Sequence, residues 1–145
     1  MLVQVADVAA AVEAADGGAD IVIAQGVEAG GHVQGTKSVF ELVRDVRAVL
    51  GLPIVAAGGI ADHNSARAAL AAGANAVASG TAFLAASEAD VHPVYRNRLS
   101  GAVAADTVLT TVFDVGWPDA PHRVLQNRTY LDWVAAGEPA HHKRP

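Results

Sequence analysis

Residues 20–32 read DIVIAQGVEAGGH, and this stretch decides how the rest of the chain is interpreted. It begins with an apolar run typical of a buried strand and ends with three glycines and a histidine within seven residues. Paired glycines allow the backbone to pass close to a flat ligand. His32 follows them at the carboxyl end of the strand, which is the ligand-binding side of parallel α/β sheets. The stretch therefore predicts a ligand-binding loop; the alternative is a glycine-rich turn with a surface histidine.

Apolar strands and helices alternate along the first part of the chain. Four segments have the continuous apolar character of buried parallel strands, namely 2–5, 20–24, 53–57 and 76–79. Three segments are predicted as helices, namely 8–16, 39–50 and one that is capped by Asp62 or Asn64 and stops at Gly73. Because helical crossovers connect parallel strands, this order predicts an α/β fold of about four parallel βα units.

Capping signals support the first two helices. Asp7 precedes the helix at 8–16 and can accept a hydrogen bond from the first turn. Ser38 and Glu41 have the spacing of a capping box, in which each side chain binds the backbone N–H of the other residue. Local sequence thus indicates where both helices begin.

The alternation ends after Thr81, and the remainder is predicted as a C-terminal helical arm. We expect helices at 83–88, 92–105 and 126–136, an extended segment at 107–113 and a turn-rich segment at 116–121. No linker interrupts the chain, so residues 1–145 are predicted to form a single domain, a partial β/α barrel.

Composition excludes several classes of protein. The chain has 145 residues, 52% of them hydrophobic and 17% charged, and a net charge of −5. The acidic balance argues against nucleic-acid binding, and no apolar run reaches the roughly 18 residues that span a bilayer. The absence of cysteine excludes disulfides and thiolate sites and favours a cytoplasmic location. The pair His141 and His142 lacks a third ligand at useful spacing, so no metal site is predicted.

Glycines mark the ends of three predicted strands. Gly30 and Gly31 follow the second strand, Gly58 and Gly59 follow the third, and the run 79–81, Ser-Gly-Thr, follows the fourth. Free N–H groups in adjacent βα loops form anion sites, and β/α barrels bind phosphate in the loops after their last two strands. The alternative is that these glycines only turn the chain.

The sequence also suggests roles for five other side chains near the predicted site and in the arm. Glu28 is expected to bond to loop backbone, with a second acid/base role as the alternative. Trp117 and Trp133 are expected to be packing anchors. His122 and Arg123 belong to the arm and could help to cover the site.

Three runs in this order resemble the nitronate monooxygenases, formerly called 2-nitropropane dioxygenases: Gln25 to His32, Ala56 to Ile60 and Ser79 to Phe83. The resemblance covers nearly the whole chain and implies the C-terminal half of a TIM-type (β/α)8 barrel that binds FMN. It further implies that a nitronate or nitroalkane is oxidised with molecular oxygen to a carbonyl compound and nitrite. The run that ends in His32 also occurs in FMN-dependent enoyl-ACP reductases, so the substrate class stays open.

The resemblance also implies roles for single residues. His32 is implied as the catalytic base or the group that polarises the substrate, Gln25 and Gly30 lie along the flavin, and Gly59 and the run 78–81 hold its phosphate. The full implied cofactor-binding set is Gln25, Gly30, Gly31, Gly58, Gly59, Ala78, Ser79, Gly80 and Thr81.

The chain is shorter than the family pattern requires, because a complete β/α barrel has eight strands in about 250 residues. With four βα units, the chain is expected to be a fragment or to be completed by another chain, and not to be a competent enzyme alone. Exposed sheet edges favour self-association. Two alternatives to nitronate oxidation stay open: an enoyl-ACP reductase-like activity and a non-catalytic flavin-binding remnant.

Overall fold

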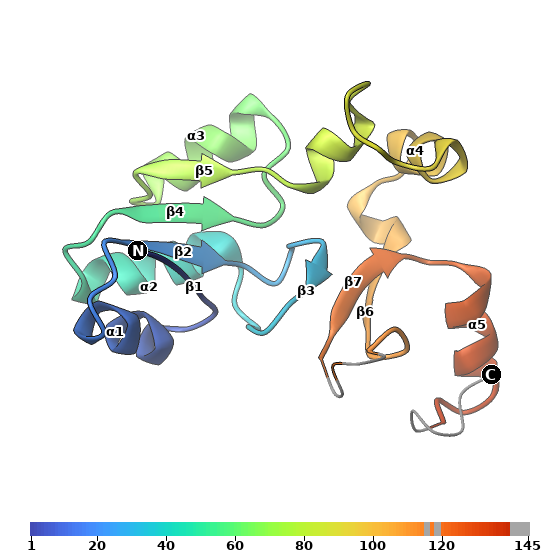
Figure 1. Cartoon of the computed structure of the whole chain (residues 1–145), viewed down its shortest axis with the longest axis horizontal. Helices are drawn as coiled ribbons and strands as arrows, with labels where there is room; N and C mark the ends of the chain where they lie inside the picture. Colours follow the sequence, from blue (N-terminus) through green and yellow to red (C-terminus); the bar gives the residue numbers. More distant parts are fainter. Residues whose placement is uncertain (115–116, 118–119, 140–145) are drawn as a thin grey trace.

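A four-stranded parallel sheet forms the first part of the fold (Figure 1). The computed structural model describes residues 1–114, 117 and 120–139. The strands stand in the order β1-β2-β4-β5, and their bounds are Leu2–Val5, Ile21–Gln25, Ile54–Ala57 and Ala76–Ala78. All four predicted strands are confirmed, and three of them have ends shifted by one residue.

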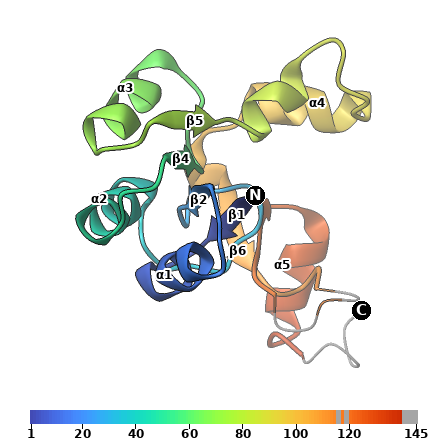
Figure 2. The same cartoon turned by 60° about the vertical axis from the view of Figure 1, so that its left-hand side comes forward.

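Three helices cover one face of this sheet (Figure 2). They are α1 (Val8–Asp16), α2 (Val39–Val49) and α3 (His63–Ala71). The core between helices and sheet contains alternate strand residues and the inner faces of the helices, among them Val22, Ala24, Ile54, Ala56, Leu42, Val43, Val46 and Ala69. The intervening strand residues, such as Ile23 and Val55, face the other side and are only half-buried. Burial therefore alternates along strands whose sequences are apolar throughout.

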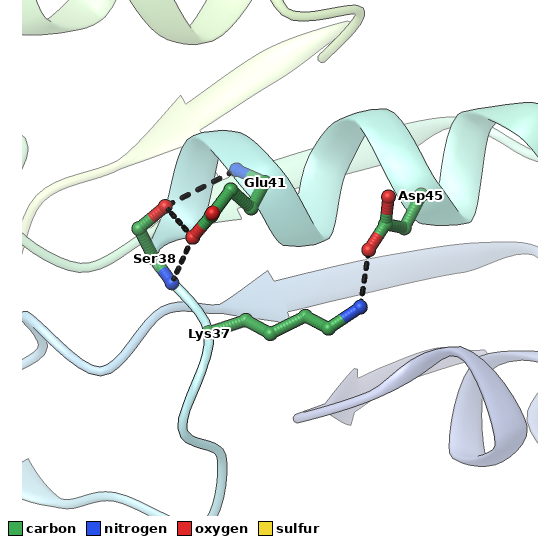
Figure 3. Close-up of polar contacts among 4 residues, drawn as sticks. All are labelled: Lys37, Ser38, Glu41 and Asp45. Carbon is green, nitrogen blue, oxygen red and sulfur yellow. Dashed lines mark hydrogen bonds and ion pairs between the residues drawn. The ribbon is translucent and has the colours of Figure 1, made fainter.

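The amino end of α2 is held by the predicted capping box (Figure 3). The Ser38 hydroxyl accepts from the Glu41 N–H at 3.3 Å, and the Glu41 carboxylate accepts from the Ser38 N–H at 3.2 Å. The Ser38 hydroxyl also donates to that carboxylate at 2.6 Å, and these bonds lower the pKa of Glu41. One turn further on, Asp45 forms an ion pair with Lys37. The start of α2 is therefore determined by residues close in sequence.

Side chains cap the other two helices of the sheet layer as well. The Asp7 carboxylate accepts from the Ala10 N–H at 2.8 Å at the start of α1, as predicted. Of the two candidates at α3, the cap is Asp62, which accepts from the Ser65 N–H at 2.8 Å. Hydrogen bonds from Ser65 lower the pKa of Asp62.

The three helices predicted in the arm are present but shorter, and the one predicted at 83–88 is a 3-10 helix that begins two residues earlier. The bounds of the helical segments are Thr81–Ala85 for η1, Pro93–Ser100 for α4, Ala104–Asp106 for η2 and Arg128–Ala135 for α5. The prediction of one helix over 92–105 is wrong at its end, because α4 stops before Gly101 and a separate turn follows. The Asp106 carboxylate accepts from the Val103 N–H at 2.8 Å, which stabilises that turn.

A three-stranded antiparallel sheet, which the sequence did not predict, is also part of the arm. Its order is β3-β7-β6, with bounds Gly31–His32, His122–Leu125 and Thr107–Thr110. The extended segment predicted at 107–113 is thus a strand only to Thr110. Figure 1 shows this sheet opposite the carboxyl ends of the parallel strands. Because β3 belongs to the central stretch, its pairing with β7 joins the two parts of the fold.

Two predictions lie partly or wholly outside the described residues: half of the turn-rich segment at 116–121, namely 116, 118 and 119, and the whole tail at 141–145. Among the residues that are described, no helix has the length and apolar character needed to cross a membrane.

Candidate active site

The carboxyl ends of β2, β4 and β5 lie together and face the antiparallel sheet (Figure 1). The last residues of β2 and β5, the loops that leave the three strands, β3 and the start of η1 contain all the residues predicted for the site. Ligands of parallel α/β folds bind at this end of the sheet. The fold therefore gathers the predicted residues at one candidate site.

The loop after β2 is held against its neighbours by backbone and carboxylate hydrogen bonds. The Gly26 N–H donates to the Ala57 carbonyl at 2.9 Å, and the Glu28 carboxylate accepts from the Val39 N–H at 3.0 Å. The expectation that Glu28 bonds to backbone is confirmed. A Cβ on Gly26 would lie 2.4 Å from both the Glu28 carboxylate and the Val39 nitrogen, so this position requires glycine.

The three loops approach one another closely at their glycines. Gly58 and Gly59 have φ values of +112° and +65°, which favour glycine. A Cβ on Gly59 would lie 2.9 Å from the Cβ of Glu28, and one on Gly30 would lie 2.5 Å from the hydroxyl of Thr81. These glycines are thus explained by packing between loops, before any ligand is considered.

A side-chain hydrogen bond joins the loops after β4 and β5. The Ser79 hydroxyl donates to the Ile60 carbonyl at 2.6 Å. In the described part of the chain, the backbone N–H groups of Gly59, Gly80 and Thr81 have no acceptor. Unpaired N–H groups on neighbouring βα loops are suited to binding an anion.

The remaining predicted binding residues have few contacts. A Cβ on Gly31 or Gly80 would meet nothing within 4 Å. Gly31 has φ +79°, which favours glycine, whereas Gly80 has φ −108° and needs no glycine for its backbone. Ala78 is the last residue of β5 and is half-buried. At Gly80, therefore, the open space above the backbone is the feature that a ligand could use.

Gln25 is buried at the end of β2 and carries an unpaired oxygen. Its side chain is 8% exposed, and its amide nitrogen donates to the His32 carbonyl at 3.0 Å. A carbonyl can only accept, so this bond sets the orientation of the amide. The amide oxygen is buried and has no partner among the described residues. A buried acceptor without a partner is costly, which favours a ligand that donates to it.

The His32 ring contacts two other aromatic rings. Its centroid lies 3.8 Å from that of His122 and 4.5 Å from that of Trp117. His32 and His122 are direct partners in the β3–β7 pair. From the sequence, His122 could be assigned only to the arm, because no local pattern in β3 or β7 indicates that these strands pair. Trp117 is 51% exposed and lies against the site, whereas Trp133 is buried as the expected packing anchor.

The His122 imidazole is in a poorly solvated position. Burial lowers the pKa of His122, and the nearby charge of His32 lowers it further. Its Nδ1 atom is buried and has no partner among the described residues. A charged imidazole needs an acceptor for each of its two N–H groups, so this environment favours the neutral ring.

Arg123, the next residue along β7, ties the arm to the central loop. Its Nε donates to the Val27 carbonyl at 3.0 Å, and a terminal nitrogen donates to the Thr107 hydroxyl at 3.2 Å. No local pattern in the sequence indicates this role, because Arg123 and Val27 are 96 positions apart.

Comparison with known proteins identifies the family. The model of the family "Nitronate monooxygenase" matches residues 1–136. Nitronate monooxygenase of Pseudomonas aeruginosa is 45% identical over 143 residues, which cover 90% of this chain and 38% of that protein. FabK from Thermotoga maritima has a TM-score of 0.82 and 41% identity, over 90% of this chain and 40% of its own. A nitroalkane oxidase from Streptomyces ansochromogenes has a TM-score of 0.81 and 38% identity, over 97% of this chain and 44% of the oxidase chain.

Two statements follow from these similarities. The fold is confirmed as part of a TIM-type (β/α)8 barrel. The chain spans about two-fifths of the length of the relatives it matches.

Proposed function

The chain belongs to the nitronate monooxygenase family, and from this premise we propose that it serves FMN-dependent oxidation of alkyl nitronates by molecular oxygen. The products are a carbonyl compound and nitrite. The proposal is carried by the convergence of three glycine-containing loops and one histidine at the carboxyl end of the sheet. It concerns a complete barrel, because the chain spans only part of its relatives.

The described residues fit both polar parts of FMN. The unpaired N–H groups of Gly59, Gly80 and Thr81 can donate to a phosphate. The orphan amide oxygen of Gln25 can accept a hydrogen bond from the N–H of a flavin ring. The space above Gly80 leaves room for close approach of a ligand to the backbone. These observations support the cofactor-binding roles that the family resemblance implies.

The protein's own contribution is to bind, to orient and to move a proton. When bound, FMN would take electrons from the substrate and pass them to oxygen. The imidazole of His32 is the group proposed to accept the proton from the carbon beside the nitro group, which forms the nitronate. Gln25 positions this residue by binding its carbonyl, and Trp117 covers part of its ring.

Two measurements test the proposal. FMN fluorescence is titrated against the 145-residue chain to measure binding. Turnover is measured in a chimera in which this chain replaces the matched segment of the Pseudomonas aeruginosa relative. We expect nitrite release and oxygen uptake from the nitronate of 2-nitropropane, without a nicotinamide cofactor. A folded, FMN-loaded chimera that releases no nitrite, beside an active parent, would refute the proposal.

The same assays separate the two alternatives. An enoyl-ACP reductase-like protein would oxidise a nicotinamide cofactor with an enoyl thioester and release no nitrite. A non-catalytic remnant would bind FMN and support neither reaction.

Two further expectations stay predictions. Self-association is favoured because β1 and β5 are the edges of the parallel sheet. The cytoplasmic location rests on the absence of cysteine.

A further inference from the structure

Two histidines from distant parts of the chain form one contact pair. His32 on β3 and His122 on β7 stand directly opposite each other in an antiparallel pair. Their ring centroids are 3.8 Å apart, with 54° between the ring planes. Side chains directly opposite on antiparallel strands restrain each other, so neither ring can turn freely without displacing the other.

The pair is poorly suited to hold two protons. Two imidazolium rings at this separation repel each other strongly. Protonation of His122 would also place an N–H on its buried Nδ1, which has no acceptor among the described residues. His122 is therefore expected to stay neutral when His32 takes up the proton that it is proposed to remove from the substrate.

Among the described groups around His122, His32 is the main one whose charge affects the protonation of His122. On β6 the residue opposite is Thr110, which does not titrate in this pH range. The adjacent Arg123 directs its guanidinium to the Val27 carbonyl and to a threonine hydroxyl. Trp117, which contacts His32, carries no charge. Within the described ranges, His32 is the one charged group that contributes to the lowered pKa of His122.

We propose that His122 is a positioning residue for His32: its ring packs at a tilt against the His32 ring, fixes the orientation of that ring and opposes a second proton on the pair. The importance of this pair for turnover rests on the proposed function, in which His32 moves the proton. The pairing itself does not depend on that function, so the two can be tested separately.

The test is an NMR titration of the histidine rings in the 145-residue chain, recorded for the parent, His32→Phe and His122→Phe. Phenylalanine retains an aromatic ring in the pair but cannot be protonated. We expect the titration midpoint of His122 to rise by about 0.5 pH unit or more in His32→Phe, because a neighbouring positive charge has been removed. A purely structural contact would leave this midpoint unchanged.

His63 serves as the internal control, because it is exposed on α3 and should titrate at the same midpoint in all three proteins. Should either phenylalanine variant fail to fold, His32→Gln and His122→Gln answer the same question. An unchanged His122 midpoint in a folded His32 variant would overturn the inference. Coupled titrations without nitrite release would instead refute only the proposed function, since the titration uses neither flavin nor substrate.

Discussion

The guanidinium of Arg123 donates to the carbonyl of Val27 at 3.0 Å and so connects the arm to the loop after β2. The same side chain donates to the Thr107 hydroxyl at 3.2 Å. One residue thus bonds the central loop, its own strand and the neighbouring strand together. The position of β3, and with it His32, depends on how firmly the arm is attached.

Replacement of Arg123 should destabilise the chain. We expect Arg123→Ala to lower the free energy of unfolding by about 1.5–3 kcal/mol, because hydrogen bonds from a charged, half-buried donor are lost. Urea denaturation measures the change. Arg128→Ala is the matched control, since Arg128 only pairs with Asp132 on the surface, and it should change stability by less than about 0.5 kcal/mol. Equal effects of the two substitutions would contradict this role of Arg123.

The hydrogen bond between Ser79 and Ile60 should matter for the cofactor. Ser79→Ala removes the bond that joins the loops after β4 and β5, and we expect the Kd for FMN to rise about 2- to 10-fold. Ser87→Ala, at an exposed serine that bonds only to Glu88, should leave the Kd unchanged. Fluorescence titration compares them, and equal Kd values for the parent and Ser79→Ala would show that this bond does not organise the site.

Gly80 offers a test of phosphate binding that leaves the backbone unstrained. Gly80→Val should weaken FMN more than tenfold and more than Gln25→Ala does, because its side chain would fill the space that a phosphate needs. Gly59 is a poorer probe, since φ +65° and the contact with Glu28 would strain the fold regardless of ligand. Thermal unfolding without FMN should be similar for Gly80→Val and the parent. A larger loss of affinity in Gln25→Ala would show that the ring, not the phosphate, anchors FMN.

His32 should be needed for proton abstraction rather than for cofactor binding. In the chimera, His32→Gln should retain FMN but lose about 10²–10⁴-fold in turnover of 2-nitropropane, the typical contribution of a positioned acid–base group. The loss should be smaller when the substrate is already the nitronate. His63→Gln, at an exposed histidine of α3, is the control. Full activity of His32→Gln with the nitroalkane would remove His32 from the mechanism.

The stability of the chain should depend on pH through His122. Its pKa in the folded chain lies below the ordinary value of 6.5, first because of burial and then because of the charge of His32. The unfolded chain therefore takes up the proton first, and stability falls as the pH decreases below 6.5 toward the folded pKa. Above that range both states are neutral and the contribution is constant.

His122→Phe should reduce this pH dependence. We expect the urea midpoint to fall less between about pH 7.5 and 5.5 in the variant than in the parent. The carboxylates with lowered pKa values, such as Glu41 and Asp62, titrate below this window and do not interfere. An identical fall in both proteins would show that His122 does not titrate differently in the folded and unfolded chains.

Local sequence was sufficient for the parallel sheet and for the starts of its helices. Asp7 and Ser38 cap helices through bonds to residues three positions away, so the information lies within one turn. The apolar runs of β2 and β4 are equally local, because an apolar run of strand length between turn residues is itself a strand signal, although burial alternates along both strands. The three runs 25–32, 56–60 and 79–83 and their order along the chain were enough to indicate the family that the comparisons confirm.

Only the tertiary structure decided which residues meet at the site. The pairs His32 with His122, Arg123 with Val27 and Ser79 with Ile60 join strands and loops that are distant in sequence. The antiparallel sheet was missed for the same reason, since β3 has two residues and no strand signal apart from its partner. A strand this short acquires its hydrogen bonds from the chain that folds against it, so its existence, and the surroundings of His32, are properties of the packed molecule.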